Sequence, residues 1–200
     1  MPRDLLFEIG VEEIPASYIL PALNQLAESL ERGLEEARLS FESTSTMATP
    51  RRLTVVVRGV ADAQTSETKT VTGPPARIAF GEDGSPTKAA TGFAKSQGVE
   101  VASLKVVGDY VQVEVTDAGG PAADVLPSLL TAAADTLTFP KTMKWGPDRR
   151  FARPIRWLVA LLGGEVLDLT YADVSAGNAT RGLRVWSPGP HTVESADAYE

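Results

Sequence analysis

The residues best suited to binding chemistry in this sequence are basic and are concentrated in residues 141–156. That stretch has six Lys or Arg residues and one acid, Asp148, so its net charge is +5 in a chain whose net charge is −7. It also contains Trp145 and Phe151. Basic side chains interleaved with aromatic rings suit phosphate contacts and base stacking. The segment predicts an anionic partner, either a nucleic acid or an acidic protein face, and the alternative is a solvated basic loop.

Two further arginine pairs stand in short connecting segments. Arg51 and Arg52 follow Pro50 between two expected strands, where guanidinium groups can bind a phosphate or a carboxylate through two hydrogen bonds. Arg181 and Arg184 form a weaker pair near the end of the sequence. The candidate RNA- or partner-binding residues are Arg51, Arg52, Lys141, Lys144, Trp145, Arg149, Arg150, Arg181 and Arg184.

No catalytic or metal-binding residue is predicted. The sequence has no Cys and one His, His191, which excludes thiolate and multi-histidine metal sites. Neither a Walker-type phosphate loop nor a dinucleotide-binding glycine motif occurs. Glu8, Glu12 and Glu13 form an acidic group at the end of the first expected strand, where paired carboxylates could hold magnesium. The favoured interpretation is that Glu12 and Glu13 precede a helix, whose N-terminus attracts acids.

The order of the expected elements indicates an α+β fold of mixed helices and antiparallel hairpins, because strands and helices do not alternate regularly. Leucines at helical spacing predict one buried face on the first helix. Residues 139–147 are expected to be irregular, and glycine and proline predict a break at residues 73–75. Strands are expected at 5–10, 41–47, 53–60 and 65–71, hairpins at 104–115 and 156–171, and helices at 15–37, 88–97 and 122–137, with another helix beginning near 192.

The composition is that of a globular protein. Hydrophobic residues make up 43% of the 200 residues, enough for a sizeable core, and no signal peptide or membrane span is visible. We therefore expect a soluble, cytoplasmic chain.

The glycine- and proline-containing breaks divide the sequence into three consecutive segments. The expected divisions are an α+β lobe at 1–74, a short helix with a hairpin at 75–118, and a helix, basic loop and hairpin at 119–200.

Five blocks of the sequence occur in a fixed order. They are FEIGVEEIPA at 7–16, TPRRL at 49–53, GPP at 73–75 with AF at 79–80 and GSPTKAA at 84–90, FPKTMKWG at 139–146 and FARPIRW at 151–157. Together and in this order they resemble the β subunit of bacterial tetrameric glycyl-tRNA synthetase. One departure lies in TRGLRV at residues 180–185, where the family usually has histidine and an aromatic residue in place of Leu183 and Val185.

The resemblance implies an N-terminal fragment of a non-catalytic subunit, similar to the front body domains of class II synthetase β chains. It would end before the family's HD-type and anticodon-binding regions. The implied enzyme is an α2β2 glycine–tRNA ligase in which the α subunit binds ATP, Mg²⁺ and glycine, and the β subunit helps to position tRNA(Gly). No cofactor is expected in this chain, and the isolated chain is expected to be inactive. The alternatives are a stand-alone RNA-binding module and an amino-acid-binding or editing-type domain.

Overall fold

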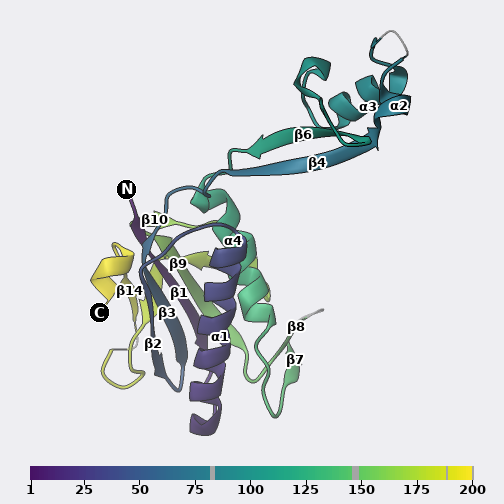
Figure 1. Cartoon of the computed structure of the whole chain (residues 1–200). Coiled ribbons are helices and arrows are strands. Elements are labelled where there is room, and N and C mark those ends of the chain that lie inside the picture. The colour runs from purple at the N-terminus through teal and green to yellow at the C-terminus, as the bar shows by residue number, and fades with distance from the viewer. Residues whose placement is uncertain (82–83, 146–148, 188, 200) are drawn as a thin grey trace. The chain divides into compact units, whose positions relative to one another are not determined.

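The computed structural model describes residues 1–81, 84–145, 149–187 and 189–199 (Figure 1). The chain divides into a large unit, residues 1–64 with 120–200, and a small unit, residues 65–119. This division differs from the three consecutive segments expected from the sequence. Strand β1 (Arg3–Val11) pairs with β9 (Ile155–Leu162), and this pairing joins the first and last of those segments in one sheet.

A seven-stranded sheet forms the large unit, with strands in the order β11-β12-β9-β1-β3-β2 and β10 paired to β9. The pairs are antiparallel except that of β12 with β9. Both faces of β1 are covered, so every residue from Leu5 to Val11 is buried. The other strands are β2 (Ser43–Thr49), β3 (Arg52–Val60), β10 (Glu165–Val166), β11 (Thr170–Tyr171) and β12 (Val174–Gly177).

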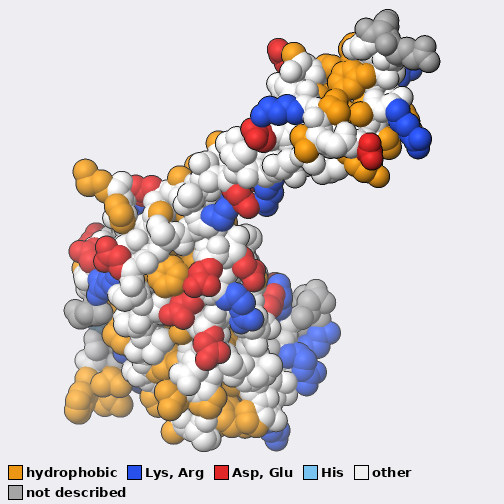
Figure 2. All heavy atoms as spheres, viewed as in Figure 1, with side chains coloured by type: hydrophobic (Ala, Val, Ile, Leu, Met, Phe, Trp, Pro, Cys, Tyr) orange, Lys and Arg blue, Asp and Glu red, His pale blue; other side chains and the backbone are white. Residues whose placement is uncertain are grey.

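Helices α1 (Ala16–Glu36) and α4 (Ala122–Asp135) cover one face of this sheet (Figure 1). The predicted leucine stripe of α1 is confirmed: its four members are buried in one cluster with residues of β1, β3 and α4. Gly33 allows a close approach of the helices, since a Cβ there would lie 2.9 Å from Leu129 Cγ. Figure 2 shows acidic side chains gathered over α1 on its outer side. The buried stripe is Leu23, Leu26, Leu30 and Leu34.

The opposite face of the sheet is covered by the last part of the chain. Leu6, Val56 and Leu161 form a second cluster there with Val193 and Ala196. Strands β13 (Ala179–Arg181) and β14 (Pro190–Thr192) pair with each other, and a 3-10 turn, η2 (Ala196–Tyr199), follows. The helix expected from residue 192 is therefore a strand end and one 3-10 turn within the described residues.

The small unit contains a three-stranded sheet in the order β4-β6-β5. The hairpin at 104–115 and the helix at 88–97 are confirmed, and Thr87 Oγ1 caps the helix by accepting from the Ala89 N–H. The break expected at residues 73–75 is wrong, because β4 continues through them with a register shift that accommodates the prolines. The elements are β4 (Glu67–Pro75), α2 (Ala76–Ala79), α3 (Lys88–Ser96), η1 (Val101–Ser103), β5 (Lys105–Val107) and β6 (Tyr110–Asp117).

The residues at which the chain leaves and re-enters the large unit are hydrogen-bonded to each other. The Gln64 N–H donates to the Gly120 carbonyl oxygen over 2.9 Å, and the Gly120 N–H donates to Gln64 Oε1 over 3.0 Å. Ala63 and Pro121 form an adjacent β-bridge. The chain therefore leaves the large unit and re-enters it at one place.

Two other expectations need correction. Residues 139–147 are partly regular, since β7 (Met143–Trp145) pairs with β8 (Arg149–Phe151); residues 146–148 lie outside the described residues. In the hairpin expected at 156–171, only β10 returns along β9, because β12 occupies the neighbouring position on β9 and β11 pairs with β12. Within the described parts of the chain, no helix is long and apolar enough to cross a membrane.

Candidate functional site

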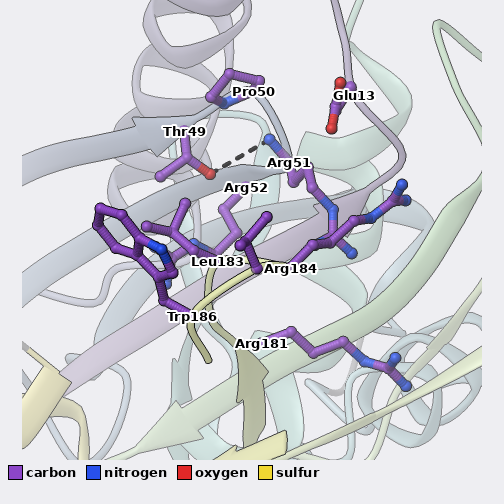
Figure 3. Close-up of a pocket in the computed structure, with 11 residues that line it drawn as sticks. Glu13, Thr49, Pro50, Arg51, Arg52, Arg181, Leu183, Arg184 and Trp186 are labelled. Carbon is purple, nitrogen blue, oxygen red and sulfur yellow. Dashed lines mark hydrogen bonds between the residues drawn. The ribbon is translucent and has the colours of Figure 1, made fainter. Parts of the chain in front are cut away.

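Four of the candidate arginines line one pocket of about 550 Å³ in the large unit. Arg51 and Arg52 come from the β2–β3 turn, while Arg181 ends β13 and Arg184 follows it. Figure 3 shows these side chains together, although they come from segments far apart in the sequence. We call this site the arginine pocket. Its other lining residues are Glu13, Thr49, Pro50, Gly182, Leu183, Val185 and Trp186.

The arginine pocket carries uncompensated positive charge. Arg184 forms an ion pair with Glu12, which also lies 3.5 Å from Arg156 Nε. Among the described residues, Arg51, Arg52 and Arg181 form no ion pair. The Nε of Arg51 is buried and has no hydrogen-bond partner within the same residues. Such a group of guanidiniums favours an anionic ligand.

The indole ring of Trp157 lies beneath two of these arginines. The Cζ atoms of Arg51 and Arg181 lie 5.5 Å and 5.7 Å from the centroid of the ring, within the range of cation–π attraction. Gly10, the partner of Trp157 across β1 and β9, leaves room for the ring, since a Cβ at residue 10 would lie 2.0 Å from ring carbons. The position of Trp157 therefore helps to set the positions of Arg51 and Arg181.

A buried carboxyl group fixes Trp157 in turn. Glu8 Oε1 accepts a hydrogen bond from Trp157 Nε1 over 2.5 Å and another from Thr180 Oγ1 over 2.7 Å. The Tyr199 hydroxyl donates to Glu8 Oε2, and it lies 3.2 Å from Thr54 Oγ1. Burial, together with the charge of Glu8, raises the pKa of Tyr199 to about 12. The network joins the sheet to the last part of the chain.

The acidic group expected at Glu8, Glu12 and Glu13 is therefore not a single site. Glu8 is buried within the sheet, Glu12 pairs with arginines, and Glu13 borders the arginine pocket. Glu8 lies within β1, whereas Glu12 and Glu13 follow the end of that strand at Val11, so the three side chains have different surroundings. Among the described residues, no cluster of three or more His, Asp or Glu side chains could hold a metal ion.

The described residues of the basic segment from Lys141 to Arg150 lie on and beside β7 and β8, where Figure 2 shows Lys and Arg side chains gathered. Arg153 and Arg156 instead contact Glu13 and Glu12, beside the arginine pocket. Arg149 pairs with Asp135, and its Cζ lies 4.9 Å from the ring centroid of Tyr171. Arg150 donates to Thr142 Oγ1 over 3.2 Å. These arginines thus have partners within the chain.

The remaining candidates of this segment differ in exposure. Lys141 and Lys144 are exposed and have no ion-pair partner among the described residues. Trp145 is half-buried, and its Nε1 donates to the Phe151 carbonyl oxygen over 3.1 Å. The lysines are therefore the members of the segment that are free to meet an anionic partner.

The sequence-based reasoning did not single out Glu8, Trp157 or Trp186 for the roles that the structure gives them. A single acid within the otherwise apolar strand LLFEIG was the available signal for Glu8, because a buried carboxyl group needs donors. For Trp186, the available signal was a group of large apolar residues, with Leu183 and Val185, in a stretch rich in Gly, Pro and Arg, because such a stretch is typical of an exposed loop. Leu183, at the position where the resemblance led us to expect histidine, lines the arginine pocket.

Fold and pocket together define an α+β protein with a cationic pocket in its large unit. Residues 5–200 match the profile described as the glycyl-tRNA synthetase beta subunit, and the chain belongs to that family. It is 48% identical to the glycine–tRNA ligase beta subunit of Moorella thermoacetica and 45% identical to that of Myxococcus xanthus, over its whole length in both cases. The chain spans about 29% of the length of these relatives.

Proposed function

We propose that this chain acts as a non-catalytic part of a cytoplasmic glycine–tRNA ligase, supporting assembly with an α subunit and positioning tRNA(Gly). The single observation that carries the proposal is the uncompensated charge of Arg51, Arg52 and Arg181 in a chain of this family whose net charge is −7. Charge of this kind gives contacts to RNA phosphates that do not depend on base sequence.

The proposed assembly is an α2β2 heterotetramer in which ATP, Mg²⁺ and glycine bind to the α subunit. The described residues that line the arginine pocket are mainly basic and apolar. Their contribution to the rate would come from holding the tRNA end beside the activated amino acid, since positioning alone can supply much of a rate enhancement. The isolated chain is accordingly expected to lack aminoacylation activity.

The exposed lysines of the basic segment and the arginine pocket can be tested separately in the full subunit. One variant carries Lys141→Ala with Lys144→Ala, and the other carries Arg52→Ala with Arg181→Ala. Measurements of tetramer assembly by sedimentation and of tRNA affinity by filter binding distinguish the two partners. We expect assembly to persist and tRNA affinity to fall about equally for cognate and non-cognate tRNA.

Two results would point elsewhere. A tetramer that dissociates before tRNA affinity changes would assign the altered surface to the α subunit. If both variants keep assembly, tRNA affinity and aminoacylation, neither surface contributes to the ligase and the proposed role is wrong. A Lys69→Ala variant in the small unit, whose lysine pairs with Glu67 at 3.0 Å, serves as the control for loss of surface charge.

A further inference from the structure

We propose that the arginine pocket binds an unpaired nucleotide of an RNA strand, with its phosphate held by Arg51, Arg52 and Arg181 and its base stacked on Trp186. The inference rests on the proposed function, which supplies the RNA. It adds the form in which that RNA is bound, single-stranded rather than duplex, and it assigns Trp186 a role in recognition.

The charges lining the pocket favour a phosphate. The described lining of the pocket has four arginines and one carboxylate, Glu13. Of these arginines, Arg184 pairs with Glu12, a carboxylate that also pairs with Arg156. The buried Nε of Arg51 has no acceptor among the described residues, so the chain itself leaves this guanidinium incompletely satisfied. Planar guanidinium groups bind phosphate oxygens through paired hydrogen bonds, which a single lysine cannot do.

Trp186 is the one aromatic side chain among the described residues that line the pocket. Its side chain is 85% exposed and lines the same pocket as the arginines (Figure 3). Trp157, by contrast, is 6% exposed and is already covered by Arg51 and Arg181. An exposed indole beside several arginines is the combination with which proteins stack and hold single-stranded bases.

The dimensions of the pocket favour one unpaired nucleotide over a duplex. A volume of about 550 Å³ is within the roughly 300–1,000 Å³ of small-molecule sites. In an A-form duplex the base faces are stacked against one another and cannot reach an indole ring, whereas an unpaired base can turn outward. Of these two forms of RNA, the aromatic face of Trp186 therefore favours the unpaired one.

An acidic and apolar protein segment is the competing occupant. Leu183 and Val185 are 60% and 86% exposed beside Trp186, and tryptophan and arginine are both enriched at protein interfaces. Three of the arginines have no carboxylate partner within the described parts of the chain, and they favour the phosphate because a polynucleotide carries one negative charge per residue. The experiment below includes this competitor.

The test uses the full subunit assembled with its α partner. The probes are a short single-stranded oligoadenylate, an RNA duplex of equal length and a peptide of alternating Glu and Leu. Affinity is measured in every variant by the fluorescence anisotropy of a dye-labelled probe. Tryptophan fluorescence, compared between the wild-type chain and Trp186→Phe, identifies the signal of Trp186. We expect the single strand to quench that signal and to bind more tightly than the duplex. Trp186→Ala should weaken binding about 5- to 150-fold.

Matched variants make the result specific. Trp186→Phe should keep most of the affinity, because phenylalanine also stacks, and Tyr110→Ala should have no effect, because this exposed tyrosine lies in the small unit. Equal affinity for duplex and single strand, full affinity in Trp186→Ala, or preference for the peptide would overturn the inference. Those results can coexist with normal tRNA binding by the assembled enzyme, in which case only this inference fails and the proposed function stands.

Discussion

Glu8 Oε1 accepts a hydrogen bond from Trp157 Nε1 over 2.5 Å, inside a sheet in which Glu8 is fully buried. The same indole ring lies beneath the guanidinium groups of Arg51 and Arg181. A carboxyl group with no contact to the solvent is therefore connected, through one aromatic side chain, to the cationic pocket. This relationship makes Glu8 a positioning residue in the proposed function.

Replacement of Glu8 tests that connection. Glu8→Ala leaves the donors of Trp157, Thr180 and Tyr199 without their acceptor, so we expect a loss of about 3 kcal/mol or more in the free energy of unfolding. Glu8→Gln keeps one acceptor oxygen and should lose less. Urea unfolding gives the stability and tryptophan fluorescence reports the environment of Trp157. Unchanged unfolding in Glu8→Ala would show that the network contributes nothing.

A side chain at Gly10 should be poorly tolerated. The Cβ of Gly10→Ala would lie 2.0 Å from ring carbons of Trp157, so the ring has to move and the packing on this face is lost. We expect about 3 kcal/mol of destabilisation, near the upper end for overpacking. Gly177→Ala, whose Cβ would meet no described atom within 4 Å, is the control and should change stability by less than about 0.5 kcal/mol. Similar unfolding midpoints for the two variants would contradict the prediction.

The leucine stripe of α1 gives a second comparison of stability. Leu26 is fully buried among residues of the sheet and α4, and Leu26→Ala should lower the free energy of unfolding by about 2–5 kcal/mol. Leu20, on the same helix, is 65% exposed, and Leu20→Ala should have little effect. Chemical denaturation of both variants provides the measurement. Equal effects would mean that the stripe faces a partner instead of the core.

Tyr199 predicts a loss of stability at alkaline pH. Its folded pKa of about 12 lies above the ordinary value of about 10, so the folded state retains the proton longer than the unfolded chain. The stabilisation linked to this proton is complete below about pH 10 and is lost as the pH rises through about 12. Urea midpoints across that range should fall more steeply for the wild-type chain than for Tyr199→Phe. Parallel curves would exclude the linkage.

The helices and the central strands were predictable because their side chains follow the periods of helix and strand. The leucines of α1 recur every three or four residues, and residues 53–57 of β3 are apolar or β-branched. The edges of the sheet were not predictable in this way. Whether residues 166–171 return along β9 depends on which strand occupies the position beside β9. That strand is β12, and its parallel pairing with β9 is a long-range interaction that the local sequence does not predict.

The candidate site was predictable only in its residue types. Arg51 and Arg181 were recognised as separate pairs by their charge and their turns, but their convergence on Trp157 depends on β1 pairing with both β3 and β9. The net charge of residues 141–156 overstates how much positive charge is free to bind a partner. Arg149 pairs with Asp135, an acid that lies outside these residues in the sequence. Charge counts along a sequence cannot include partners that folding supplies.

The chain leaves the large unit at Gln64 and returns to it at Gly120, and these two residues are hydrogen-bonded to each other. The seven-stranded sheet, the helices that cover it and the arginine pocket are all built from residues before Gln64 or after Gly120. A short turn from Gln64 to Gly120 would close the same fold, and lengthening the connection adds only slowly to the entropy of loop closure. Residues 65–119 therefore occupy a position in which an entire module can be gained, lost or exchanged without altering the path of the chain through the rest of the protein.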